Sequence, residues 1–305
     1  MQDPEVEQAA EFLAAHALLL LALGILAAVL LLVAIVCAVR VAARFRPAIQ
    51  GAFTTLVQRA RAIDVPRRVI GRTQGFVPSA YLAMHLALGF VTAVAVAVFA
   101  ALVEEALAGG EMAAFDLAFA RALHAGRHPE WTRVFSTVSW LGSREVLTVA
   151  TVSVALVLIS RQQIVLAVGW IAAQAGGGLL NRALKETFER TRPEFADPLL
   201  AASSWSFPSG HAMGTFILCG VGCYLLLREN RSWLAAATAV TLSASWCVVM
   251  AFSRLYLGVH FASDVIAGVV AGAAWVAVCA SGVEVLRRKS AVRTSSRGRG
   301  RRSTG

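Results

Sequence analysis

Residues 16–39 read HALLLLALGILAAVLLLVAIVCAV, an apolar run that is long enough to cross a lipid bilayer as one helix. A membrane-spanning helix needs about 20 mostly apolar residues. The residues before this run are acidic, whereas a signal peptide starts with basic residues and has a shorter apolar core. We therefore expect a true membrane span over residues 13–39.

The rest of the chain has the same apolar character. Of its 305 residues, 58% are apolar and 15% are charged, and the mean hydropathy is +0.68; ordinary soluble domains have about 25% charged residues. This composition excludes a disordered chain and disfavours a water-soluble enzyme. Six further apolar segments cover 81–103, 145–160, 163–181, 211–227, 233–252 and 264–286. The predicted fold class is all-α, a polytopic membrane helix bundle with seven spans.

Basic residues gather in alternate loops, and this pattern predicts the orientation of the spans. Eight arginines and a single acid, Asp64, lie between the first two spans. Arg161 separates the third and fourth spans, and Arg228 and Arg231 separate the fifth and sixth. Because positively charged short loops stay in the cytoplasm, we expect the N-terminus outside and the C-terminus inside.

The tail after Leu286 carries eight basic residues and no acid, so the rest of the chain has a net charge of only +2 out of +10. A basic tail can bind nucleic acid, or it can touch anionic lipid beside a membrane span. The neighbouring spans favour the lipid interpretation. We expect the bilayer as a partner and no nucleic acid.

These features predict four parts of the chain. Residues 1–40 form an extra N-terminal transmembrane helix, and 41–79 form an Arg-rich cytoplasmic connector. Residues 80–286 form a six-span core, and 287–305 form a disordered basic cytoplasmic tail. A composition rich in Arg, Ala, Gly and Val favours a bacterial source, so we expect a protein of the bacterial cytoplasmic membrane.

Three polar segments fall on the face opposite to the basic loops. They read KETFERTRP over 185–193, PSGH over 208–211 and SRLYLGVHFASD over 253–264. His211 and Arg254 are 43 residues apart with a polar stretch midway, which fits two antiparallel helices of about 30 Å each. Both segments, and the first one with them, are therefore expected at the same outer membrane surface.

The residue types in these segments suit a phosphate group. Lys185, Arg192 and Arg254 donate hydrogen bonds and accept none, and guanidinium groups pair well with tetrahedral oxyanions. Ser209 and Gly210 stand at a predicted helix start, where free backbone N–H groups and the helix dipole favour an anion. We predict that these five residues bind phosphate.

The two histidines and one carboxylate suit nucleophilic catalysis. Asp264 lies four residues after His260, one helical turn on, and can accept a hydrogen bond from the imidazole ring. Such a bond fixes the tautomer and strengthens the ring as a nucleophile. His211 is a second imidazole, suited to protonating a leaving group near neutral pH. We predict His260, His211 and Asp264 as the catalytic residues.

Each segment alone has a simpler explanation, such as a helix start, a loop end or a satisfied interface pair. Cys219 and Cys223 lie one helical turn apart, but no His, Asp or Glu lies close in sequence to complete a metal site. We expect neither a metal nor another cofactor. The three segments together, on one face, favour a catalytic site, because ionisable groups at the membrane are costly.

At these positions the sequence resembles the type 2 phosphatidic acid phosphatase superfamily of membrane lipid phosphatases, whose helical core is related to the vanadium haloperoxidases. The family pattern is Lys, six residues, Arg-Pro; then Pro-Ser-Gly-His; then Ser-Arg, five residues, His, three residues, Asp. Every fixed position is present in this chain. The resemblance covers about 80–286 and implies six spans and metal-free chemistry.

The resemblance also implies a role for each residue. His260 would be the nucleophile that forms a phosphohistidine, with Asp264 orienting it and His211 acting as the general acid. The substrate would be phosphatidic acid, phosphatidylglycerol phosphate or a polyprenyl diphosphate. Two alternatives stay open: a phosphotransferase that passes the phosphoryl group to a hydroxyl acceptor, and a non-enzymatic transporter or scaffold that binds an anion. The oligomeric state is not indicated by the sequence.

Overall fold

The computed structural model describes residues 4–27, 29–30, 80–195, 204–229 and 232–302. Within these ranges the chain is helical and contains no strand. The helices are α1 (Pro4–Ala15), α4 (Ala80–Leu107), α5 (Glu111–Ala125), α6 (Pro129–Leu141), α7 (Arg144–Ser160), α8 (Ile164–Phe188), α9 (Gly210–Glu229), α10 (Trp233–Tyr256) and α11 (Ala262–Arg302). A further helix, Ala17–Ala27, follows α1 at a bend of 76°. The all-α fold class is confirmed.

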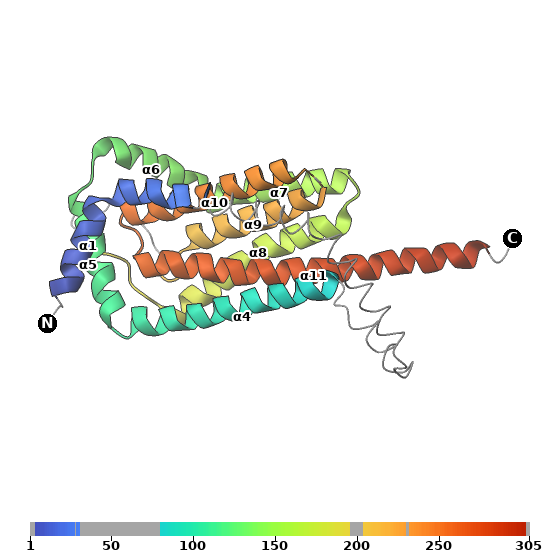
Figure 1. Cartoon of the computed structure of the whole chain (residues 1–305), viewed down its shortest axis with the longest axis horizontal. Helices are drawn as coiled ribbons and strands as arrows, with labels where there is room; N and C mark the ends of the chain where they lie inside the picture. Colours follow the sequence, from blue (N-terminus) through green and yellow to red (C-terminus); the bar gives the residue numbers. More distant parts are fainter. Residues whose placement is uncertain (1–3, 28, 31–79, 196–203, 230–231, 303–305) are drawn as a thin grey trace, which may run out of the picture.

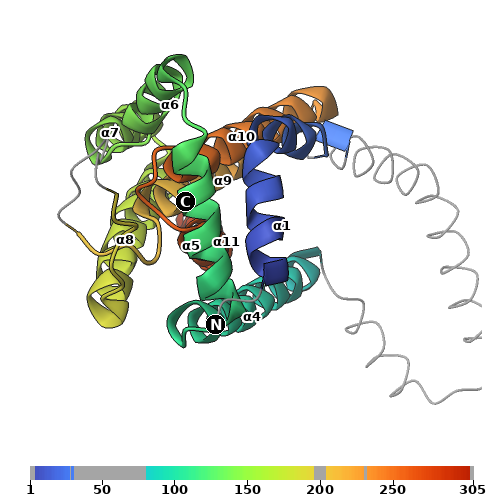
Figure 2. The same cartoon turned by 90° about the vertical axis from the view of Figure 1, so that its left-hand side faces the viewer.

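Long helices run lengthwise through the molecule, and α5 crosses one end of them (Figure 1). Seen from that end, α5 and α1 lie in front of the bundle, and the two helices pack against each other (Figure 2). The short turn at 161–163, the end of α9 and the start of α10 lie at the opposite end. As a result, the end of α8, the start of α9, the end of α10 and the start of α11 all lie at the end of the bundle that α5 crosses.

Five helices are long and apolar enough to cross a membrane: Met84–Leu107, Ile164–Phe188, Gly210–Arg228, Leu234–Tyr256 and Ala262–Arg287. Two bent helix pairs, Pro4–Ala15 with Ala17–Ala27 and Pro129–Leu141 with Arg144–Ser160, raise the number to as many as seven in the described part of the chain. Seven spans were predicted. Residues 31–39 of the first predicted span and the whole connector 41–79 lie outside the described residues.

The structure differs from expectation at two places near the ends of spans. α8 continues to Phe188, so Lys185 lies on a helix and not in the loop that we expected to begin at residue 182. The backbone of α11 continues as helix to Arg302, which corrects the prediction of a disordered tail over 287–302. Extending an existing helix avoids the cost of nucleating a new one, so the helix persists beyond its apolar part.

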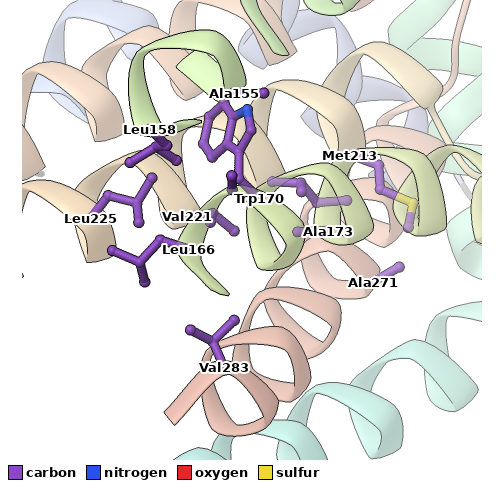
Figure 3. Packing of buried hydrophobic residues seen from close by; sticks show 12 residues of the cluster. Ala155, Leu158, Leu166, Trp170, Ala173, Met213, Val221, Leu225, Ala271 and Val283 are labelled. Carbon is purple, nitrogen blue, oxygen red and sulfur yellow. The ribbon is translucent and has the colours of Figure 1, made fainter. Parts of the chain in front are cut away.

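The core lies where α8, α9 and α11 pack together, and Figure 3 shows Trp170, Met213, Val221 and Ala271 from these helices. A Cβ atom added to Gly268 of α11 would lie 2.6 Å from the Ser209 carbonyl oxygen at the start of α9. Small residues permit such close helix contacts in membranes. This contact brings the first turn of α11, which carries Asp264, against the start of α9.

Candidate active site

One cavity of about 1120 Å³ receives side chains from all three polar segments. It lies among α6, α7, α8, α9 and α10. Six of the eight predicted site residues line it: Lys185, Arg192, Gly210, His211, Arg254 and His260. The other two, Ser209 and Asp264, are fully buried behind this wall. The three segments therefore form one site in the folded chain.

His260 lies in the short connection between α10 and α11 and is only 2% exposed. Its Nδ1 lies 3.4 Å from Oδ2 of Asp264, and its Nε2 lies 3.2 Å from a terminal guanidinium nitrogen of Arg192. These contacts fit the tautomer in which Nδ1 carries the proton and Nε2 carries the lone pair. Burial lowers the pKa of His260 to about 3, so the ring is neutral at physiological pH.

Asp264 is held by several donors besides His260. Its Oδ2 accepts hydrogen bonds from the Phe261 N–H at 2.9 Å and from the Ser206 hydroxyl, and its Oδ1 pairs with Arg190 at 2.6 Å. A carboxylate with this many donors has a fixed orientation. Asp264 therefore holds the His260 ring in one orientation through its contact with Nδ1.

The three predicted phosphate-binding cations are themselves anchored. Arg192 donates to the carbonyl oxygens of Val259 at 2.6 Å and Ser204 at 2.8 Å, and burial lowers its pKa. Arg254 is 5% exposed and donates to the Ser139 hydroxyl, and its Nε is buried with no hydrogen-bond partner. Lys185 donates to the Trp205 carbonyl oxygen. These contacts leave a buried guanidinium donor of Arg254 available for an anion.

The start of α9 differs in detail from the prediction. The Ser209 N–H, expected to be free for an anion, donates to the Asp264 carbonyl oxygen at 2.9 Å. The Ser209 hydroxyl is buried and has no hydrogen-bond partner. Gly210 and His211 open α9, and the N–H groups of a first helical turn lack intrahelical partners. The backbone donors for an anion therefore begin at Gly210.

Two charged residues at the site were not predicted from the sequence. Arg190 lies between Asp264, at 2.6 Å, and Asp116 of α5, at 2.9 Å, with its side chain 10% exposed. Asp116 is fully buried and also accepts from the Ser263 N–H at 3.0 Å. A signal existed for Asp116, which is a lone acid between Phe115 and Leu117 in an otherwise apolar stretch. Arg190 was hidden among the other charges of its loop.

The described residues contain no group of three or more His, Cys, Asp or Glu side chains placed to hold a metal ion. Cys219 and Cys223 are free thiols in α9, away from the residues that line the cavity. The cationic wall of the cavity is built from Lys and Arg.

Comparison with known proteins identifies the class of this helical site. Residues 164–288 match the model of the PAP2 superfamily. The solved structure of a transmembrane PAP2-type phosphatidylglycerolphosphate phosphatase from Bacillus subtilis superposes with a TM-score of 0.58 at 28% identity, over 66% of this chain and 97% of that one.

Curated relatives match this chain over part of their own length. Phosphatidylglycerophosphatase B of Bacillus subtilis is 44% identical over 91 residues, which are 30% of this chain and 44% of that protein. Decaprenylphosphoryl-5-phosphoribose phosphatase of Mycolicibacterium smegmatis is 36% identical over 105 residues, 32% of this chain and 52% of that protein. The chain thus spans about half the length of these curated relatives. With five to seven candidate spans in its described part, it is an integral membrane protein, and its residues 164–288 are similar to the PAP2 superfamily.

Proposed function

We propose that this protein is a membrane phosphatase that removes phosphate from a lipid phosphate monoester or diphosphate through a phosphohistidine intermediate. The observation that carries the proposal is the environment of His260. One ring nitrogen is held by a buried carboxylate, and the other meets Arg192 at the wall of the cationic cavity. An oriented, neutral imidazole facing an anion site is equipped for nucleophilic attack on phosphorus.

In the first step, the Nε2 lone pair of His260 attacks phosphorus and the bond from phosphorus to the leaving oxygen breaks. Asp264 keeps the Nδ1 proton in place and compensates the positive charge that forms on the ring. His211, on the same cavity wall, donates a proton to the leaving alcohol or phosphate. In the second step, His211 accepts a proton from water while the water oxygen attacks phosphorus, and the phosphorus–nitrogen bond breaks.

Three cations stabilise the phosphoryl oxygens in both steps. Lys185, Arg192 and Arg254 reach the cavity from α8, the following loop and α10. Preorganised donors aimed at developing charge lower the barrier most when the site excludes water. These cations supply the charge that Mg²⁺ supplies in other phosphoryl transfer enzymes, so we propose turnover without a metal.

The cavity is also large enough for more than a phosphate group. Its volume of about 1120 Å³ slightly exceeds the range of about 300–1,000 Å³ that drug-sized ligands occupy. Ile171, Gln174 and Gly178 of α8 line it away from the cations. This supports a substrate with a lipid portion that lies along α8, entering from the outer leaflet if the basic loops are cytoplasmic.

The test is release of inorganic phosphate by the full-length protein in detergent with excess chelator. Polyprenyl diphosphate, phosphatidylglycerol phosphate and phosphatidic acid are compared side by side, and His260→Ala serves as the blank. We expect chelator-resistant release that the variant abolishes. His128→Ala is the matched control, because His128 is exposed and its bond to the Tyr256 hydroxyl uses the backbone N–H.

Each other outcome is informative. Equal activity in His260→Ala and the wild type makes the nucleophile assignment wrong. Loss of activity on chelation contradicts the metal-free step. Phosphate release that appears only after a hydroxyl acceptor is added identifies a phosphotransferase, and no reaction under any condition favours a non-enzymatic anion-binding protein.

A further inference from the structure

A buried ion cluster connects α5 to the nucleophile. Arg190 lies between two fully buried carboxylates, with its guanidinium nitrogens 2.9 Å from Asp116 and 2.6 Å from Asp264. It also donates to the Ser263 hydroxyl at 2.7 Å and stacks on the Phe261 ring at 4.5 Å from its centroid. Among the described residues, these side-chain partners of Arg190 other than Asp116 all belong to 261–264, the start of α11 and the residue before it.

The charges of this cluster do not cancel. With both carboxylates ionised, the two acids and Arg190 give a net charge of −1 on the Nδ1 side of His260, while Arg192 lies on the Nε2 side, where the phosphate would bind. The His260 ring is neutral because burial lowers its pKa. An unpaired negative charge in a buried place is costly unless something compensates it. Attack by Nε2 makes the His260 ring a phosphoimidazolium with one positive charge. The cluster is therefore neutralised at the moment when the intermediate forms.

We propose that Asp116 and Arg190 are positioning residues that orient Asp264 and set the charge that receives the cationic His260 ring. This inference rests on the proposed function of His260. Asp116 lies outside residues 164–288, the part of the chain that matches the family model, so α5 becomes part of the working site. Arg190 acts through Asp264, and Asp116 acts through Arg190.

The alternative is a purely structural link that ties α5 to the bundle. The two possibilities differ in what happens when charges are removed together. Arg190→Gln leaves two carboxylates facing each other with a net charge of −2, and like charges at short distance force one of them to take up a proton. Adding Asp116→Asn restores −1. A charge-balancing role predicts that the second substitution rescues the first, whereas a structural link predicts further damage.

The pH dependence provides a second distinction. The charged groups near Asp264 are Arg190 and Arg192 from the segment after α8, Lys185 from the end of α8, and His260 before α11. Asp116 from α5 acts on it through Arg190. Burial raises the pKa of Asp116, and its bonds to Ser263 and Arg190 oppose that rise. Without Arg190 the carboxylates hold a proton to higher pH, so activity that needs ionised Asp264 is lost sooner as the pH falls.

The experiment compares the full-length wild type with Asp116→Asn, Arg190→Gln and the double variant by kcat, KM and pH profile of phosphate release. We expect kcat to fall about 10-fold in Asp116→Asn and about 100-fold in Arg190→Gln, with KM nearly unchanged, as for other partners that orient a reacting group. The double variant should recover about 10-fold over Arg190→Gln. In Arg190→Gln the acid limb of the pH profile, where activity falls with falling pH, should lie at higher pH than in the wild type. In the double variant it should return to the wild-type pH.

Arg228→Gln is the matched control, because it removes an arginine that pairs with a carboxylate far from the cavity. A double variant no more active than Arg190→Gln overturns the inference. The inference is also overturned if the loss of activity in the variants is fully explained by a smaller fraction of folded protein. Thermal unfolding in the same detergent measures that fraction. If Arg190→Gln does not fold, the kcat and KM of Asp116→Asn decide: loss in kcat alone supports positioning, and unchanged kcat refutes it. A wild type that releases no phosphate refutes the proposed function instead.

Discussion

A charge cluster lies at each end of the stretch over which α9 and α11 pack together. At one end, the first turn of α11 carries Asp264, which pairs with Arg190, and the side chains of this pair are 0% and 10% exposed. At the other end, Arg228 of α9 pairs with Glu284 of α11, and these side chains are 29% and 16% exposed. Both are carboxylate–guanidinium pairs, but their surroundings differ.

The difference lies in what the acid touches besides the arginine. Glu284 accepts from Arg228 and from the Tyr224 hydroxyl. Asp264 accepts from Arg190, Ser206, the Phe261 backbone and His260. Partly exposed ion pairs contribute about 0–1 kcal/mol, whereas a buried, connected pair orients its neighbours. Substitutions that are chemically alike should therefore have unequal effects at the two ends.

The largest contrast is expected on α11, between Asp264→Asn and Glu284→Gln. The first change removes the charge that compensates the His260 ring and disturbs its tautomer, and such changes in catalytic triads cost about 10⁴-fold in kcat. We expect a loss of at least about 10³-fold, and no more than about twofold for Glu284→Gln. Steady-state phosphate release measures both. Equal losses would remove the distinction between the two clusters.

A smaller contrast is expected between Arg254→Gln and Arg228→Gln. The Nε of Arg254 is buried without a hydrogen-bond partner at the cavity, which fits a donor that waits for a phosphoryl oxygen. Loss of one such donor costs about 10²–10³-fold in kcat. Arg228→Gln should stay within about twofold of the wild type. Arg254→Gln with normal kcat would mean that this guanidinium only holds Ser139.

A third contrast concerns the lipid part of the cavity. Gly178 lines the cavity and Gly222 does not, and a Cβ added to either meets no atom within 4 Å. Gly178→Leu should therefore lower kcat/KM for long-chain substrates by about 10-fold, because the extra side chain takes up their space. Gly222→Leu should leave it unchanged.

A short, water-soluble phosphate monoester provides the internal control for this test. Its kcat/KM should be the same in Gly178→Leu and the wild type, because it needs only the cationic part of the cavity. Equal losses for long and short substrates would place the leucine against the catalytic residues and would contradict a separate lipid part.

The sequence predicted the elements that follow from periodicity and spacing. Apolar runs indicated the spans, and antiparallel geometry predicted that His211, Arg254 and His260 lie at the same end of their helices. In the structure all three line one cavity. The sequence did not predict that α8 extends past Lys185, since the polar end of a helix carries no apolar signal. Asp116 was missed for another reason: it reaches Ser263 across 147 residues, and no local pattern encodes a contact that depends on how α5 crosses the bundle.

The smallest expected change is in the protonation of His260, which should not titrate in the physiological pH range. His260 has a pKa of about 3 instead of the ordinary 6.5, because burial disfavours the charged ring more than Asp264 favours it. The ring should therefore stay neutral as the pH falls from about 8 to about 5, the range in which an unperturbed histidine gains its proton. NMR of protein with ¹³C-labelled histidine rings measures this, and the spectrum of His260→Ala identifies the signal.

We expect the His260 signal to keep its position over that range. A midpoint near the ordinary value would show that water reaches the ring and that Asp264 dominates its charge state. With the expected result, the nucleophile is ready at every physiological pH. Any acid limb in phosphate release then belongs to another group, such as the substrate phosphate or Asp264. A shift of that limb between the wild type and Arg190→Gln on the same substrate therefore reports on the buried cluster at this end of α11.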